Sequence, residues 1–308
     1  MAGLTIKLFL VEGTPTGTLT AEIGNWTGKV IVSPRPQLAD LAKRPEAKRT
    51  GLYCLVGRDP DNPTRDCVYI GETDNLLGRL AEHDRDAKQK LDFWTRTILI
   101  GSKDENLTKA HARYLEARLL AKSRAADRAR ITNDTSPEPT PLPESDVADM
   151  EQFLSHLEVM LPALGFAFLQ PAPQIGSQAP VASSASPLFR LHSVGIEATA
   201  REIDGEFVVL KGSTARKEGT PSWTSREQRE ELVADRKLVD HATDTTVYVF
   251  ATDVPFDSPS AAATVVRAGN TNGRKEWKEA STGKSYGDWK ELRLKLAGVE
   301  PETRSTGS

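Results

Sequence analysis

The stretch Cys67–His83, CVYIGETDNLLGRLAEH, contains one predicted strand and the first turns of a predicted helix. The segment CVYIGE is short and rich in β-branched and aromatic residues, which is typical of a β-strand. Helix-forming residues follow, and Asn75 is a suitable N-cap for a helix over residues 76–90. Alternate side chains of a strand point to opposite faces, so Tyr69 points away from its two apolar neighbours. If those neighbours face the core, Tyr69 faces a cleft or solvent.

Around this stretch, residues 51–135 follow the order strand, strand, helix, strand, helix. The strand GLYCLVG precedes the stretch, and the turn-forming segment GRDPDNPTRD between the two strands predicts a hairpin. A third strand, FWTRTILIG, leads to a long helix at 107–128, which either Asn106 or Thr108 caps. Two helices on a small antiparallel or mixed sheet predict the α+β fold class.

Composition divides the rest of the chain. Two Pro/Ser/Ala-rich breaks at 135–145 and 170–187 are typical of linkers, and between them residues 145–164 predict an amphipathic helix with an acidic outer face. We therefore expect an N-terminal β-rich extension (1–46), an α+β domain (47–135), a Pro-rich linker with the acidic helix (136–189), a second small α+β domain (190–296) and a disordered tail (297–308).

Two of these segments carry further local signals. In the extension, LTIKLFL and GKVIVS predict a hairpin followed by a short helix near 36–42, which either extends the sheet of 47–135 or packs on the trailing domain. In the trailing domain, a hairpin is expected to turn at Asp204-Gly205. A helix there is expected to begin with Ser258 as N-cap and Pro259 at its first position.

Composition also limits the class of protein. The chain has 308 residues, of which 38% are hydrophobic, enough for two compact domains. The net charge of −3 arises in the middle segment 136–189, which has six acidic and no basic residues, so basic clusters remain on either side. No apolar run approaches the roughly 20 residues that span a bilayer. With Cys54 and Cys67 expected as reduced core thiols, the sequence predicts a cytoplasmic protein without a membrane span.

Several polar side chains stand out from this framework. Arg79 and His83 are four residues apart on one helix and hence neighbours on one face. Glu116 lies among apolar residues of the long helix, and a buried carboxylate needs a partner, either a divalent cation or Arg113. Taken singly, each residue also has an ordinary structural interpretation, as a strand aromatic, a solvated helix face or an ion-pair partner.

Their order resembles that of a known family. Gly51-Leu-Tyr53, then Val68-Tyr69-Ile-Gly71, then Arg79, His83 and a helical Glu116 resemble the GIY-YIG endonuclease family over about residues 47–135. The resemblance implies a phosphodiesterase site with two paired tyrosines, an arginine beside the scissile phosphate, a histidine in the acid/base network, a single metal-binding carboxylate and a late asparagine. In this chain those residues are Tyr53 and Tyr69, Arg79, His83, Glu116 and Asn133.

The resemblance implies a metal-dependent enzyme acting on nucleic acid. We expect an endonuclease that uses one Mg²⁺ or Mn²⁺ ion per site, with DNA favoured over RNA as its substrate and a role in restriction or defence by family association. Glu72 and Asp74 depart from the family pattern by placing two acids near the phosphate. These two acids leave open the alternative that the protein binds nucleic acid, or has a regulatory role, without cleaving its substrate. A nuclease that works only in a complex also remains open, with the acidic helix 145–164 docking a partner chain or with the protein forming a homodimer.

The trailing domain carries a weaker signal. Ser258-Pro-Ser260-Ala-Ala-Ala263, followed by Gly269, Asn272-Gly273 and Trp277, resembles an uncharacterised domain that often follows GIY-YIG nucleases. It implies no known activity. Cations interleaved with aromatic residues suit nucleic acid, which makes candidates of Arg274, Lys275, Trp277 and Lys278. The alternative is that Trp277 and Trp289 are core residues of a small domain.

Overall fold

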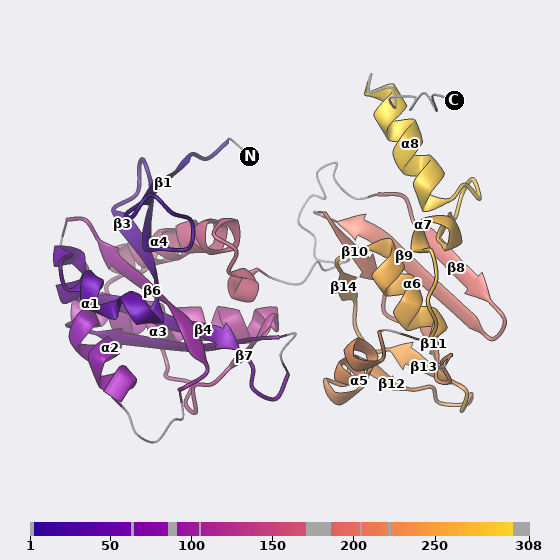
Figure 1. Cartoon of the computed structure of the whole chain (residues 1–308), viewed down its shortest axis with the longest axis horizontal. Coiled ribbons are helices and arrows are strands. Elements are labelled where there is room, and N and C mark those ends of the chain that lie inside the picture. The colour runs from indigo at the N-terminus through magenta and orange to yellow at the C-terminus, as the bar shows by residue number, and fades with distance from the viewer. Residues whose placement is uncertain are drawn as a thin grey trace, which may run out of the picture. The chain divides into compact units, whose positions relative to one another are not determined.

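The structure, a computed structural model, divides the chain into two compact units, Met1–Pro171 and Ala172–Ser308. It describes residues 3–62, 65–85, 91–104, 106–170, 186–203, 205–220, 223 and 225–297. Both units combine sheets with helices (Figure 1). The α+β fold class predicted from the sequence is therefore confirmed.

The first unit is built on a seven-stranded sheet in the order β1-β2-β3-β6-β4-β5-β7. Neighbouring strands are antiparallel except β5 and β7, which are parallel, so the sheet is mixed. The strands are β1 (Ile6–Leu10), β2 (Leu19–Ile23), β3 (Gly28–Pro34), β4 (Gly51–Arg58), β5 (Asp66–Thr73), β6 (Trp94–Ser102) and β7 (Ala129–Ile131). The predicted hairpin is present as β4 and β5.

The N-terminal segment extends this sheet, which decides between the two expected placements. Strand β3 pairs with β6 along seven residues, from Gly28 opposite Ser102 to Pro34 opposite Arg96. The predicted strand pairing within the segment is wrong, because β1 pairs with β2 and not with β3. The sequence LTAEI of β2 has no strong strand signal, since it is short and its neighbours are turn residues. The expected short helix is present as η1 (Arg35–Gln37) and α1 (Leu38–Leu41), followed by η2 (Pro45–Lys48).

Helices cover both faces of the sheet. Helix α2 (Leu76–Arg85) packs on one face beside Leu55 of β4, and α3 (Lys109–Ala126) packs on the other beside Leu52. Residues 86–90, the expected end of α2, lie outside the described residues. The expected cap of α2 is present, since Asn75 Oδ1 accepts a hydrogen bond from the Gly78 backbone N–H at 3.1 Å.

The start of α3 is fixed by Thr108 and not by Asn106. Thr108 Oγ1 accepts a hydrogen bond from the His111 backbone N–H at 3.2 Å, and His111 Nδ1 accepts one from the Thr108 N–H at 3.3 Å. Together they form a reciprocal capping box with histidine in the third position.

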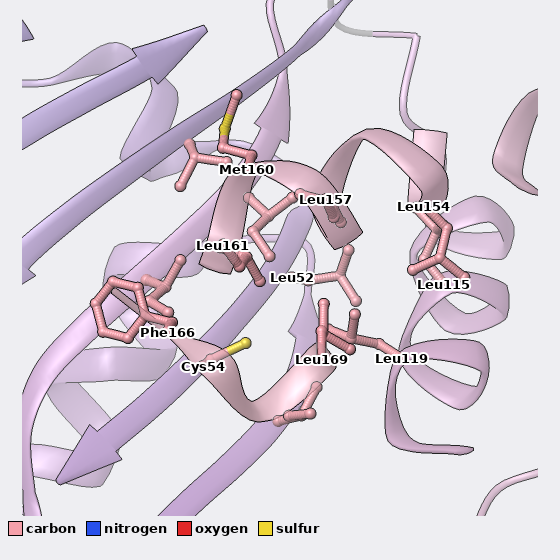
Figure 2. Close-up of a cluster of buried hydrophobic side chains, with 14 of the residues drawn as sticks. Leu52, Cys54, Leu115, Leu119, Leu154, Leu157, Met160, Leu161, Phe166 and Leu169 are labelled. Atoms are coloured by element: carbon pink, nitrogen blue, oxygen red, sulfur yellow. The ribbon is translucent and has the colours of Figure 1, made fainter. Parts of the chain in front are cut away.

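Helix α4 (Glu144–Ala163) corresponds to the acidic helix expected at 145–164, but its assignment to a linker is wrong. Its apolar face is buried in the core of the first unit, together with the short η3 (Ala167–Leu169), as Figure 2 shows. The buried residues of this face are Met150, Phe153, Leu154, Leu157, Met160 and Leu161. Because the sheet and α3 already occupy this face, a partner chain cannot dock on it without unfolding the unit.

The second unit contains two smaller sheets. A five-stranded sheet has the order β14-β10-β9-β8-β15, and a three-stranded sheet has the order β11-β13-β12. Its strands are β8 (Phe189–Ser193), β9 (Ile196–Ile203), β10 (Glu206–Val209), β11 (Thr214–Arg216), β12 (Leu238–Asp240), β13 (Val247–Phe250), β14 (Val254–Phe256) and β15 (Lys278–Glu279). Its helices are α5 (Arg226–Ala234), α6 (Pro259–Arg267), α7 (Gly273–Glu276) and α8 (Tyr286–Leu296).

Local predictions for this unit agree with the structure where it is described. The hairpin β9–β10 places Ile203 opposite Glu206, while Asp204 of the expected turn lies outside the described residues. Helix α6 begins as expected: Ser258 Oγ accepts a hydrogen bond from the Ala261 N–H at 3.1 Å, and Pro259 occupies the first position.

The nucleic-acid-binding role considered for Trp277 is wrong. Its side chain is fully buried among aromatic residues of the second unit, and its indole Nε1 donates a hydrogen bond to the Pro259 carbonyl at 2.9 Å. A ring without exposed surface cannot stack on a base. Arg274, Lys275 and Lys278 do lie exposed beside it, whereas Trp289 is partly buried against the same core.

The structure also bears on the predictions for the two cysteines and for a membrane span. Cys54 and Cys67 are both buried and form no disulfide, as expected of core thiols. Among the helices of the described residues, none combines the length and the apolar character needed to cross a bilayer.

Candidate active site

Tyr53 and Gly71 lie opposite each other in the β4–β5 hairpin. A Cβ atom added to Gly71 would lie 2.4 Å from both Cζ and Oη of Tyr53, closer than atoms can approach. The absence of a side chain at Gly71 is therefore what allows the Tyr53 ring to lie across β5. The centroid of the Tyr69 ring, on the same face of the hairpin, is 6.1 Å from that of Tyr53. The two tyrosines expected to pair do so.

Helix α2 adds a histidine and an arginine to the pair. His83 Nε2 lies 2.8 Å from Tyr53 Oη, and Arg79 Nε donates to the same oxygen at 3.4 Å. The predicted neighbours Arg79 and His83 thus meet at one phenol, because four residues separate them on the helix. The result is a hydrogen-bonded chain that runs from Arg79 through Tyr53 to His83.

Burial determines the protonation of this chain. Tyr53 is 1% exposed, and burial raises its pKa well above the ordinary value of a tyrosine, while the hydrogen bond from Arg79 acts in the opposite direction. The phenol consequently keeps its proton at neutral pH. Arg79 is a donor, so Tyr53 Oη accepts from it, while the direction of the hydrogen bond between Tyr53 Oη and His83 Nε2 depends on the tautomer of the imidazole.

Tyr69 is the accessible tyrosine. Its ring is only partly buried, and it meets the His83 ring edge-on at a centroid distance of 5.5 Å. Arg79 is also accessible, with a side chain 42% exposed that pairs with Glu82 at 2.7 Å. Hydrogen bonds to Tyr53 and then to Glu82 raise the pKa of Arg79, which keeps its full positive charge. A ligand approaching this face meets Tyr69, Arg79 and His83, with Tyr53 behind them.

Asn133 lies at the outer edge of β5 and not in this cluster. Its Oδ1 accepts from the Ile70 N–H at 2.9 Å and its Nδ2 donates to the Ile70 carbonyl at 2.6 Å. The side-chain amide thereby continues the strand pairing of β7 for one more step, following Thr132, whose N–H bonds to the Val68 carbonyl at 2.9 Å. Asn133 holds the backbone between Tyr69 and Gly71, a positioning role.

Glu116 lies at the same edge, one step further along β5. Strand alternation directs the backbone N–H of Glu72 to the edge where Ile70 is bonded, and Glu116 accepts a hydrogen bond from it. Burial raises the pKa of the half-buried Glu116 carboxyl, and the charge of Glu72 raises it further. Glu116 therefore comes from the α3 side of the sheet, whereas the tyrosines and α2 lie on the other side.

The acids that depart from the family pattern are balanced by cations. Lys109 Nζ lies 2.6 Å from Glu72 Oε2 and 3.4 Å from Asp74 Oδ2, and Arg113 Nε lies 3.5 Å from Glu72 Oε1. Arg113 forms its ion pair with Glu72, and its positive charge also opposes the rise that burial causes in the pKa of Glu116, the partner considered for it from the sequence. The electrostatic objection to a phosphate near Glu72 is correspondingly weaker.

The residues at the strand edge fit a one-carboxylate magnesium site. Within the described residues, no group of three or more His, Cys, Asp or Glu side chains is arranged to hold a metal ion. A Mg²⁺ ion bound to one carboxylate, with water and phosphate oxygens as its other ligands, needs no such group. Glu116 has carboxylate oxygens of the kind that Mg²⁺ binds, its burial disfavours the charged form, and a bound cation would compensate that cost.

Sequence reasoning missed two residues of this site. Lys109 is seven residues before Glu116 on the same face of α3, and this helical spacing is a signal that was available. The steric role of Gly71 depends on which residue lies opposite it in β4, and that register is set by the hairpin as a whole.

Comparison with known proteins concerns the second unit. Residues 189–290 match the family model described as Domain of unknown function (DUF4357). The match lies outside the cluster of Tyr53, Tyr69, Arg79 and His83. Comparison with curated proteins and with solved structures gave no match.

Proposed function

We propose that the protein is a divalent-metal-dependent endonuclease of the GIY-YIG type, acting on DNA, with the second unit contributing substrate recognition. The observation that carries the proposal is the hydrogen-bonded chain from Arg79 through Tyr53 to His83 beside the accessible Tyr69. A guanidinium, a phenol and an imidazole in contact form a site for a phosphodiester, since they supply a cation for its oxygens and groups that transfer protons.

Each residue has a role in hydrolysis that its surroundings support. The planar guanidinium of Arg79 binds a non-bridging phosphate oxygen and stabilises the charge that grows there as water attacks phosphorus. Tyr69, the accessible tyrosine, acts as the base in its phenolate form: it first gives its proton to solvent and then takes a proton from the attacking water. His83 and Tyr53 form the adjoining hydrogen-bonded pair, in which burial keeps Tyr53 protonated. The bond from phosphorus to the leaving sugar oxygen breaks, that oxygen takes a proton from solvent, and Tyr69 returns the proton it took from water to solvent.

Glu116 would hold the metal ion at the edge of β5, where its carboxylate accepts a hydrogen bond from the Glu72 backbone N–H. When bound, a divalent cation supplies charge stabilisation to the phosphate and to the leaving oxygen. Asn133 fixes the strand that carries Tyr69. A catalytically silent version of the fold is less favoured, because Lys109 and Arg113 balance the acids that motivated it.

The test is cleavage of supercoiled plasmid and of labelled oligonucleotides in the presence of Mg²⁺ or Mn²⁺. Wild type is expected to cleave, and Glu116→Ala, Arg79→Ala and Tyr69→Phe are each expected to lose about 100-fold or more in rate. Tyr53→Phe is expected to lose less, since its hydroxyl touches neither substrate nor water in this assignment.

Matched controls separate chemistry from folding. Arg58→Ala removes an exposed arginine at the far end of β4 that pairs with Asp66, and it is expected to cleave like wild type. Full activity in Glu116→Ala would refute the metal assignment. DNA binding without cleavage under both metals would favour the silent alternative.

A further inference from the structure

The second unit contains a pocket of about 320 Å³ with a positively charged lining. Its walls come from the end of β11, the end of α6 and the loop that follows α6. Among the described residues the lining is formed by Arg216, Thr220, Arg267, Gly269, Asn270 and Thr271, so two guanidinium groups share the pocket with hydroxyl and amide groups.

The two arginines keep hydrogen-bonding capacity for a ligand. Arg216 donates to the Val194 carbonyl at 3.1 Å, and Arg267 pairs with Glu276 at 2.8 Å. A guanidinium group has five N–H donors, so each of these contacts leaves most of the fork unused. Both side chains are only partly buried and open to the pocket.

A third arginine contacts the backbone of the pocket wall. Arg229 is 9% exposed and stacks on the Trp223 ring at 4.1 Å. Its guanidinium donates to the backbone carbonyls of Arg216 and Lys217, and within the described part of the chain it forms no ion pair with a carboxylate. Burial lowers its pKa, while the charges of Tyr248 and Glu230 act in the opposite direction.

The backbone around the pocket is held in place before any ligand arrives. The Thr220 N–H donates to the Ala268 carbonyl at 3.0 Å, which joins the two walls. The far end of the loop is anchored where the Gly273 N–H donates to Ser260 Oγ at 3.1 Å, and a Cβ at Gly273 would lie 2.1 Å from the Pro259 carbonyl oxygen. A rigid concave site with two forked cations loses little entropy on binding a tetrahedral oxyanion.

We propose that this pocket binds a phosphate group, held by the side chains of Arg216 and Arg267. Inorganic phosphate, a mononucleotide and the backbone of a nucleic acid all present this chemistry. The proposal stands apart from the cleavage proposal, because phosphate binding here requires neither Glu116 nor a divalent metal.

The test measures binding to the full-length protein in EDTA, where the proposed nuclease is inactive. A short fluorescein-labelled DNA duplex is titrated by fluorescence anisotropy at several KCl concentrations, and inorganic phosphate is titrated by calorimetry. The variants are Arg216→Gln and Arg267→Gln. The matched control is Arg293→Gln, a surface arginine of α8 that lies over Trp289 outside the pocket.

Each pocket variant is expected to weaken phosphate binding by about ten-fold or more. If the phosphate is that of nucleic acid, each variant also lowers the slope of log K against log salt for the duplex by about 0.9, the change for one lost phosphate contact. Unchanged duplex slopes with weakened phosphate binding would assign the pocket to a free phosphate compound. Arg293→Gln is expected to bind phosphate like wild type.

Phosphate binding equal in wild type and in both variants would overturn the proposal. If a glutamine variant fails to fold, Arg216→Lys and Arg267→Lys decide, because they keep the charge and lose the two-pronged geometry. Both lysine variants are expected to bind phosphate more weakly than wild type. Unchanged phosphate affinity in these folded variants would also refute the proposal that the pocket binds phosphate.

Discussion

Gly71 and Tyr53 lie opposite each other in the β4–β5 hairpin, and the candidate active site depends on both. The ring of Tyr53 reaches His83 only because no side chain rises from β5 beneath it. Gly51 has a related role, since a Cβ there would lie 2.4 Å from the Ile100 carbonyl oxygen of β6. Gly51 and Gly71 are thus both positions where a neighbouring group lies too close for a side chain, the Ile100 carbonyl at Gly51 and the Tyr53 ring at Gly71.

Gly71→Ala is expected to displace the Tyr53 ring and to destabilise the first unit by about 1–3 kcal/mol. Urea unfolding followed by circular dichroism measures this loss. The matched control is Gly101→Ala in β6, where the nearest atom to an added Cβ is 3.9 Å away, and it is expected to change stability by less than about 0.5 kcal/mol. Equal effects of the two substitutions would contradict the steric role of Gly71.

Glu116 gives a pH-dependent prediction at the same scale. Burial raises its pKa above the ordinary value of 4.5, so the folded protein binds this proton more tightly than the unfolded chain does. Ionising Glu116 therefore costs stability. The cost is absent below pH 4.5, develops as pH rises through the raised pKa of the folded state, and is fully present above it.

Glu116→Gln removes this cost while the side-chain oxygen still accepts from the Glu72 N–H. Without metal, the variant is expected to unfold at a higher urea concentration than wild type at pH 7, with the difference shrinking as pH falls towards 4.5. Added Mg²⁺ is expected to stabilise wild type and not Glu116→Gln. A variant less stable than wild type at pH 7 would contradict the assignment of burial as the dominant effect.

At the scale of elements, helix α4 is part of the sheet's core. Its sequence shows an apolar stripe and an acidic face, and such a pattern indicates that the stripe is covered without indicating what covers it. The structure covers the stripe with the sheet and α3 of the same unit (Figure 2). The acidic face forms ion pairs with α3, among them Glu151 with Arg118 at 2.6 Å and Glu158 with Lys122 at 2.6 Å.

Leu157→Ala tests this packing, because Leu157 is fully buried. The substitution is expected to cost about 2–5 kcal/mol in the free energy of unfolding of the first unit. Val159→Ala on the same helix is the control, since Val159 is 50% exposed and its loss is expected to cost less than about 0.5 kcal/mol. Urea denaturation of both variants decides the point, and a small effect at Leu157 would argue that α4 is dispensable.

At the scale of the whole molecule, the segment that resembles a nuclease is smaller than the unit that folds. The first unit runs to Pro171, and it needs the N-terminal strand β3 beside β6 and helix α4 over the sheet. A fragment of residues 47–135 would expose one long edge of β6 and the core face now under α4.

A fragment of residues 1–171 is therefore expected to unfold cooperatively in urea, and a fragment of residues 47–135 is expected to lack a cooperative transition. Circular dichroism against urea concentration measures both. Cooperative unfolding of residues 47–135, with a stability near that of the longer fragment, would show that the extra strands and helix are additions and not parts of the fold.

The sequence by itself determined the β4–β5 hairpin, the caps and starts of α2 and α6, the α+β class, and the proximity of Arg79 and His83. These features follow from local turn chemistry and from the periodicities of strand and helix. Only the tertiary structure decided where longer-range surfaces meet. It put β2 between β1 and β3, α4 on the first unit's sheet, Trp277 in a core, and Glu116 against Glu72 at a strand edge. The residue type and the local pattern indicate that an apolar or charged side chain requires a partner. They do not indicate which of many compatible surfaces, distant along the chain, provides that partner.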